Sequence, residues 1–169
     1  IYNGKGYNPQ RYKREQAKKV LDDWKTKAGY PKDIDEQLVK LEMSDSGNAE
    51  RLALLFRGEC CHIREAGRMS AKWLLWGGKK WDMVPDSKLY GFVTNMARIT
   101  KNAVDLYETD DDVKKYKKAF LTRSENQRGI DACLKRAQGI LDVEIKEFDN
   151  EPYLLNVQNG VLDLKKGEL

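Results

Sequence analysis

Residues 154–169 have the sequence Leu-Leu-Asn-Val-Gln-Asn-Gly-Val-Leu-Asp-Leu-Lys-Lys-Gly-Glu-Leu, in which Asn159-Gly160 separates two short apolar runs. Asn-Gly between apolar runs predicts a β-hairpin, because both central residues of a type I′ turn need positive φ. A second turn is expected at Lys165-Lys-Gly167. The chain stops directly after this turn, and we therefore expect a fragment that leads into a larger protein.

Upstream of this hairpin, apolar residues recur mostly at helical spacing. The pattern predicts helices over residues 12–27, 35–41, 48–57 and 87–108, and two further helices that follow residues 110–112 and 124. Asp45 or Ser46 is expected to cap the helix over 48–57. The last helix is expected to open with a capping box, Ser124-x-x-Gln127.

The period changes between these helices, where short extended runs alternate with turn residues. Three strands are predicted over residues 60–64, 72–76 and 79–84, joined by turns at 65–67 and 77–78. The fold class is therefore α+β, mainly α: a helical domain with a small antiparallel β-meander and a C-terminal β-hairpin. A polar linker around residues 43–47 places a boundary between an N-terminal appendage, 1–43, and the main domain, 44–169.

Composition points to a soluble protein of the cytoplasm. The chain has 169 residues, of which 40% are apolar and 34% charged, and no apolar run approaches the ~20 residues of a membrane span. Three cysteines, two of them adjacent, do not make a disulfide framework and are expected to be reduced. We expect no membrane partner.

The chain contains no recognisable catalytic constellation. Gly77-Gly-Lys-Lys80 lacks the spacing and the hydroxyl of a phosphate-binding loop. A zinc site at Cys60-Cys61-His62 is the alternative to plain thiols, but structural zinc sites space their cysteines further apart. The acidic run 110–112 is better explained by the N-terminus of a helix than by a metal. We therefore expect no catalytic or metal-binding residue, no cofactor, and no enzyme activity in this fragment.

Basic residues gather in two blocks. Residues 1–28 hold eight Lys/Arg against three Asp/Glu, and residues 57–81 hold six against two, whereas residues 142–169 hold three against seven. Basic groups beside aromatic rings are typical of surfaces that bind single-stranded nucleic acid. The candidate DNA-binding residues are Arg57, Arg64, Arg68, Lys72, Lys79, Lys80, Trp81, Arg11, Lys13, Arg14, Lys18 and Lys19. The alternative is that both blocks are ordinary solvated surface.

The tryptophans of the meander either stack on bases or belong to the hydrophobic core. We expect two of its three tryptophans, Trp73 and Trp76, to be core residues, and Trp81 stays open. Arg51 is expected to be structural, paired with Asp45 at a helix start that Gly47 keeps tight, in preference to a DNA contact.

Three blocks resemble one known family. They are Asp45-Ser-Gly-Asn-Ala-Glu-Arg51, Lys72-Trp-Leu-Leu-Trp-x-Gly-x-x-Trp81, and residues 148–169. Together they are similar to the domain that precedes the superfamily 3 helicase in phage and plasmid primases and in poxvirus-type primase-helicases. The conspicuous motif residues are Asp45, Gly47, Asn48, Arg51, Trp76, Asn156, Asn159 and Gly160.

The resemblance implies a longer parent protein with a primase module before this domain and a hexameric, ATP-driven DNA helicase after it. ATP and Mg²⁺ would belong to that helicase module, and a homo-hexamer is expected only together with it. The domain would join primase to helicase, contact single-stranded or forked DNA, and help to load the motor in a bacterial host cell, from a phage, prophage or plasmid gene. The alternative is a docking or oligomerisation collar that does not touch DNA.

Overall fold

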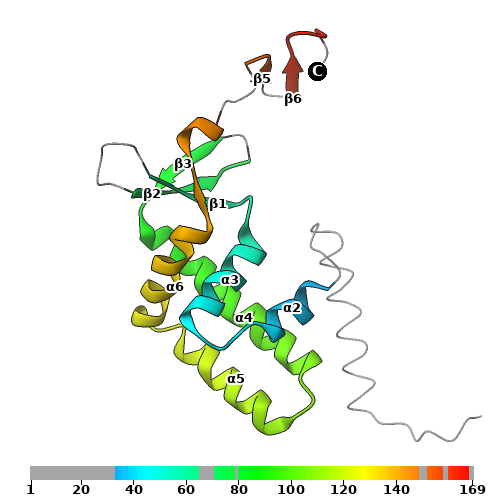
Figure 1. The fold of residues 1–169 in the computed structure, drawn as a ribbon, viewed down its shortest axis with the longest axis vertical. Coiled ribbons are helices and arrows are strands. Elements are labelled where there is room, and N and C mark those ends of the chain that lie inside the picture. The colour runs from blue at the N-terminus through cyan, green and yellow to red at the C-terminus, as the bar shows by residue number, and fades with distance from the viewer. Residues whose placement is uncertain (1–32, 65–70, 79, 149–151, 158–159, 168–169) are drawn as a thin grey trace, which may run out of the picture.

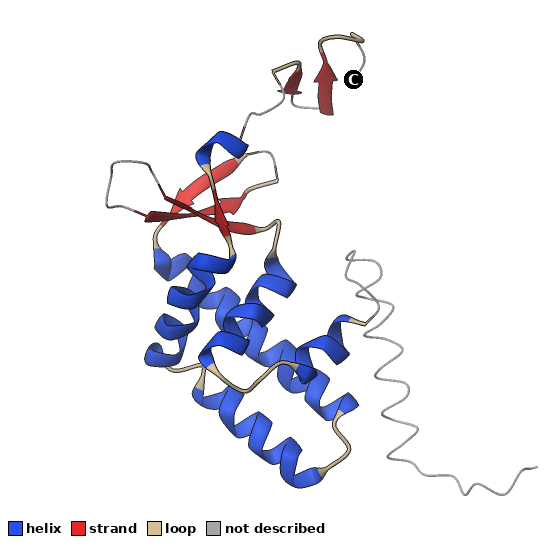
Figure 2. Cartoon of the chain, in the orientation of Figure 1, coloured by secondary structure: helices blue, strands red, loops and turns tan. Residues whose placement is uncertain are grey.

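The computed structural model describes residues 33–64, 71–78, 80–148, 152–157 and 160–167. Its α-helices are α2 (Ile34–Lys40), α3 (Asp45–Phe56), α4 (Tyr90–Tyr107), α5 (Asp111–Arg123) and α6 (Gln127–Ile140). Its strands are β1 (Cys60–Arg64), β2 (Ala71–Trp76), β3 (Trp81–Val84), β4 (Asp142–Val143), β5 (Leu154–Val157) and β6 (Gly160–Asp163). Figures 1 and 2 show the helices gathered beneath the sheet, which confirms the predicted class, α+β and mainly α. The helix predicted over residues 12–27 lies outside the described residues.

Helix starts follow capping chemistry, with two corrections to the predicted caps. Ser44, not Asp45 or Ser46, caps α3, because its extended backbone precedes the first helical residue and its hydroxyl accepts from the Gly47 amide. Asn126, not Ser124, caps α6 by accepting from the amide of Gly129 at 2.9 Å.

Ser124 instead ends α5, and the start of α6 lies against it. A Cβ added to Gly129 would lie 2.7 Å from the Ser124 Cα, so only glycine permits this close approach. At the other end of α5, Asp110 caps the helix by accepting from two backbone amides, as the acidic run predicts. Two short 3₁₀ turns complete the chain, η1 (Asp86–Leu89) before α4 and η2 (Ile145–Glu147) after β4.

The first sheet has the strand order β3-β2-β1-β4. Strands β1 to β3 are antiparallel, as predicted, but β4 adds in parallel to the free edge of β1. This strand was not predicted, because two residues are too few to carry a periodic signal. A chain that leaves α6 at its C-terminus therefore returns directly to the sheet.

Alternation along the strands gives the sheet two faces. The inner face carries Cys60, His62 and Trp73 and packs on α3, α4 and α6 to form the main core. The outer face carries a smaller apolar cluster partly covered by residues from β4 and from the segment after η2. Its members are Cys61, Ile63, Leu74, Trp81, Val143 and Phe148.

The C-terminal hairpin is present, with a register one residue away from the prediction. Val157 pairs with Gly160, so Gly160 begins β6 instead of forming the turn, and the connecting residues 158–159 lie outside the described part of the chain. The second turn is confirmed: the Asp163 carboxylate accepts from the Lys165 amide, and Gly167 has a φ of 69°. Figure 1 shows β5 and β6 standing apart from the other elements.

Candidate nucleic-acid interface

Two tryptophans face outward together on the sheet. Trp76 and Trp81 are register partners on β2 and β3, so their side chains lie on the same face, with ring centroids 5.4 Å apart. Trp76 is 42% exposed, and Trp81 is half-buried with its ring against Phe148. The result is a solvent-facing aromatic platform supported from one side.

The expectation that Trp76 belongs to the core is therefore wrong. Trp73 and Trp76 are three residues apart on one strand, so they lie on opposite faces of the sheet. Only the inner face meets the helices, where Trp73 is fully buried. Three tryptophans in one meander thus divide into one core residue and an outward pair.

Unpaired cations flank the aromatic pair. Lys72 alternates onto the same face as Trp76, and neither it nor the exposed Arg57 forms an ion pair with any described residue. Lys80 differs, because its ammonium lies 2.9 Å from the Asp82 carboxylate and the hydrogen bond with Asp82 raises its pKa. Among the described candidates, Lys72 and Arg57 are therefore the cations free to meet a phosphate.

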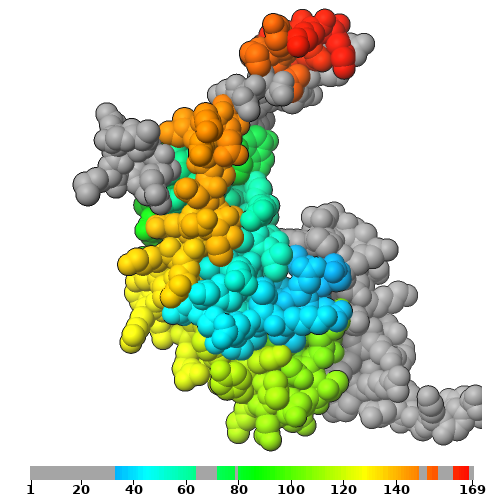
Figure 3. All heavy atoms as spheres, in the orientation of Figure 1, coloured from blue at the N-terminus to red at the C-terminus, as the bar shows by residue number. Residues whose placement is uncertain are grey.

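A cavity of about 300 Å³ connects Arg57 to the platform. Its lining includes the Trp81 and Phe148 rings, which contact each other, together with Arg57 and Ile140. In Figure 3 the segment after α6, in orange, runs upward over the sheet. The fold thus brings together two candidates, Arg57 and Trp81, that are 24 positions apart in sequence.

The other sequence-based candidates are not placed by the structure. Arg64 lies on β1, but its side chain is not described. The remaining candidates lie outside the described residues: Arg68, Lys79, Arg11, Lys13, Arg14, Lys18 and Lys19.

Sequence reasoning missed cations on α6. Arg128, Lys135 and Arg136 are exposed and form no ion pair with a described residue. Arg136 precedes Ile140 by four positions, so it lies on the side of α6 that lines the cavity. An amphipathic pattern with unpaired basic residues opposite its apolar stripe is the signal that points to them.

The block at residues 45–51 is architectural. Arg51 is fully buried, and its guanidinium donates to the carbonyls of Leu38, Leu41 and Glu42. These carbonyls lie at and after the C-terminus of α2, where backbone oxygens lack helical partners. The predicted pair with Asp45 is wrong: Asp45 is exposed and forms no salt bridge with Arg51, because the carbonyls occupy the guanidinium.

Two neighbours complete this arrangement. Asn48 donates to the Ser124 hydroxyl at 2.9 Å, which ties α3 to the end of α5. A Cβ on Gly47 would lie 2.0 Å from the Glu42 carbonyl oxygen, so glycine is required for the linker to pass.

Burial lowers the pKa of Arg51 to about 10, which leaves the guanidinium charged at neutral pH. The side chain of Asn156 is not described, Gly160 begins β6, and Asn159 lies outside the described residues.

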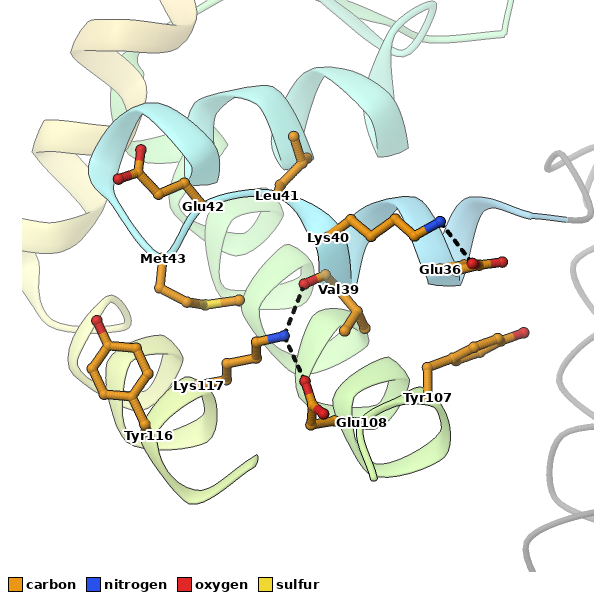
Figure 4. Close-up of a pocket in the computed structure, with 10 residues that line it drawn as sticks. All are labelled: Glu36, Val39, Lys40, Leu41, Glu42, Met43, Tyr107, Glu108, Tyr116 and Lys117. Atoms are coloured by element: carbon orange, nitrogen blue, oxygen red, sulfur yellow. Dashed lines mark hydrogen bonds and ion pairs between the residues drawn. The ribbon is translucent and has the colours of Figure 1, made fainter. Parts of the chain in front are cut away.

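A second hollow, of about 570 Å³, lies between α2 and the corner that joins α4 to α5 (Figure 4). Both lysines that line it are paired with glutamates of the same lining. Lys117 donates to the Val39 carbonyl and to Glu108 at 2.7 Å, and this bond lowers the pKa of Glu108. Lys40 pairs with Glu36 at 2.7 Å. We interpret this hollow as a packed joint between helices.

The described cysteines are free and buried, and burial raises the pKa of Cys60 to about 12 and of Cys61 to about 11. Within the described ranges, no group of three potential metal ligands is found. None of the described helices is both long and apolar enough to cross a membrane.

Comparison with known families identifies the family to which the chain belongs. A family model described as "D5 N terminal like" matches residues 49–169, and the chain belongs to this family. The family is a non-catalytic domain from the N-terminal region of D5-type primase-helicases, proteins of DNA replication. No curated protein matches the chain. No solved structure matches it either.

Proposed function

We propose that this domain joins a primase module to a superfamily 3 helicase, contacts single-stranded or forked DNA, and helps to load the motor. In this proposal ATP and Mg²⁺ are bound by the helicase module, the hexamer forms with that module, and the protein acts in the cytoplasm of a bacterial host. Family membership supports a role beside primase and helicase activities. The proposed DNA contact is supported by the side chains on the outer surface of the sheet.

The observation that carries the DNA contact is the outward Trp76–Trp81 pair with its unpaired cations. Trp76 packs on Trp81 but stays 42% exposed, and a stacked base would cover this exposed surface. Lys72 shares that face and has no carboxylate partner among the described residues. Surfaces that bind single strands with little sequence preference combine aromatic rings, which stack on bases, with cations, which meet phosphates.

The test is fluorescence anisotropy of the chain with single-stranded, forked and duplex DNA across a salt series. Binding to single-stranded or forked DNA is expected, and its logarithm should fall linearly with the logarithm of salt concentration. Lys72→Glu should weaken the DNA affinity. Lys115→Glu makes an equal charge change at an exposed position of α5 and should lower the affinity less. Absence of binding at low salt would reject the DNA contact.

A second candidate function is favoured by the hairpin. Leu154 and Leu155 are consecutive on β5, so they lie on opposite faces, yet they are 49% and 50% exposed. A two-stranded hairpin is marginal in water, and exposed apolar residues on both faces mark a surface that another module covers. This suits a docking collar that does not bind DNA.

Light scattering on the chain alone and fused to the following helicase module separates the two functions. If the domain is a docking collar, the protein should form oligomers that the double substitution Leu154→Asp with Leu155→Asp dissociates. It should also show no affinity for DNA. DNA binding that survives this double substitution supports the first proposal.

A further inference from the structure

Helix α6 carries three cations on the side that faces solvent. Arg128, Lys135 and Arg136 are exposed, and none of them forms an ion pair with a described residue. Helical spacing places them opposite the stripe that α6 buries in the core. The acidic residue of this helix, Asp131, lies at the edge of that side and accepts from Gln127. We call this surface the basic side of α6.

The neighbouring helix α5 is also rich in basic residues, but most of its charge is compensated. Three of its lysines are paired with carboxylates: Lys114 with Asp111, Lys117 with Glu108 and Lys118 with Asp105. No carboxylate among the described residues does the same for the three cations of α6. Their charge therefore remains available to an anionic ligand.

Arg128 lies where a cation costs stability. It is the second residue of α6, and the first turn contains no acidic residue, so its charge meets the positive end of the helix dipole. A cation in the last turn would be stabilising, but α6 has none there. Folding alone does not account for this placement of charge, whereas a bound anion does.

The basic side of α6 leads to the cavity beside Trp81. Arg136 precedes Ile140 by about one helical turn, and Ile140 lines that cavity together with Arg57 and Trp81. Figure 1 shows the C-terminal end of α6 just below the sheet. From Arg128 to Ile140 the helix rises by roughly 18 Å, the length of about five base pairs. A DNA backbone that follows α6 therefore reaches the sheet.

The two surfaces suit different parts of a DNA molecule. Trp76 and Trp81 offer rings to unstacked bases, whereas the basic side of α6 has no aromatic residue. The bases of a duplex are already paired and stacked, so a protein without sequence preference holds a duplex through its phosphates. Gly139 follows Lys135 by four positions and has open space where a Cβ would lie, so a phosphate backbone can approach the helix closely.

We propose that the basic side of α6 binds the phosphates of the duplex arm of a fork, while the Trp76–Trp81 pair binds the single strand that leaves the junction. The junction then lies beside Arg57 and the cavity. The inference rests on the proposed single-strand contact and adds a second surface together with the form of DNA that fits it.

Fluorescence anisotropy with a fork, with its single-stranded arm alone and with its duplex arm alone tests this arrangement. The chain should bind the fork more tightly than either arm. The triple variant Arg128→Gln, Lys135→Gln, Arg136→Gln should bind the fork more weakly and the single strand as before. For the fork, the slope of log affinity against log salt should decrease in magnitude by roughly 2.7, which is 0.9 for each lost duplex contact.

A matched control removes an equal charge from three other exposed cations that form no ion pair with a described residue. It is the triple variant Lys88→Gln, Lys115→Gln, Arg123→Gln, which should bind the fork as the unaltered chain does. Added bulk has a matched pair as well, because Gly139 and Gly91 both have open space for a Cβ. Gly139→Gln should weaken binding to the fork, whereas Gly91→Gln on α4 should not.

Neutral linkages locate the contact on the DNA and use the unaltered chain. Methylphosphonates in the first five or so base pairs of the duplex arm, about the length that α6 spans, should weaken binding to the fork. The loss should match the loss in the α6 triple variant. That variant should bind the neutral and the charged forks equally, because the cations that distinguish them are gone.

The outcomes separate this inference from the proposed function. Equal losses for the fork and the single strand in the α6 triple variant overturn the duplex contact and leave single-strand binding intact. Fork affinity that neither the triple variant nor the neutral linkages change also overturns it, and assigns the basic side of α6 to a protein partner. No affinity of the unaltered chain for any of these DNAs overturns both proposals.

Discussion

Arg51 lies in the middle of α3 and Arg57 directly follows the helix, and the two arginines have opposite environments. Arg51 is fully buried and donates to backbone carbonyls of the preceding linker, whereas Arg57 is exposed and unpaired among the described residues. The first holds α2 and α3 together, and the second is available to a ligand. The motif at residues 45–51 is thus architectural, and the cation proposed to meet a ligand lies after it in the chain.

The largest expected effect is on stability, at the buried Arg51. Arg51→Leu removes the donor of one buried and two partly buried carbonyl bonds, which are costly to leave unmet, and should lower the free energy of unfolding by about 3–5 kcal/mol. Denaturant unfolding followed by circular dichroism measures it. Arg57→Leu is the matched control and should stay within about 0.5 kcal/mol. Equal losses in the two variants would remove the distinction between these arginines.

A smaller loss is expected at the linker. Gly47→Ala places a methyl group against the Glu42 carbonyl oxygen, so the backbone must shift and the free energy of unfolding should fall by about 1–3 kcal/mol. The same measurement applies. Gly91→Ala, at an α4 position with open space for a Cβ, should be neutral or stabilising because alanine favours helix. A stable Gly47→Ala variant would show that the linker is not constrained.

On the exposed face of the sheet the effect should appear in binding and not in stability. Trp76→Ala should weaken single-stranded DNA binding by about 1–3 kcal/mol, the usual value of one stacked base, with little change in unfolding. Anisotropy and thermal unfolding of the same sample measure the two quantities. Trp73→Ala, which empties a core position, should show the converse. Lost folding without lost affinity in Trp76→Ala would contradict the platform.

The smallest effect concerns the salt dependence. Arg57→Gln removes one phosphate contact, so the slope of log affinity against log salt should decrease in magnitude by roughly 0.7 for a single strand. Lys115→Gln, at an exposed position with no ion pair to a described residue, should leave the slope unchanged. An unchanged slope in the Arg57 variant would show that the rim of the cavity does not meet phosphate.

Some parts of this fold can be predicted from the sequence and others cannot. Periodicity and turn residues suffice for α4, α5, α6 and the antiparallel meander, because these are local signals. They do not suffice for β4, which is two residues long and exists only because α6 delivers it to the edge of β1. The fold class and most helix positions are therefore predictable from local pattern alone.

The site is less predictable for the same physical reason. Whether Trp76 faces helices or solvent depends on which face of the sheet is covered, and only tertiary packing decides that. The partners of Arg51 are backbone oxygens, which carry no sequence signature. Arg57 and Trp81 meet through a cavity lined by α6 and β4, a juxtaposition that spacing along the chain does not reveal.

Strand β4 has a mechanical consequence. It is held to β1 by only two register pairs and by the bond between Asp142 and His62, and the chain continues from it through η2 to the hairpin. A force applied at the hairpin therefore reaches the contact between Phe148 and Trp81 first and then β4, before it reaches β1 along the chain. Under the proposed function, a motor that pulls on the hairpin would act first on the aromatic surface proposed to bind DNA.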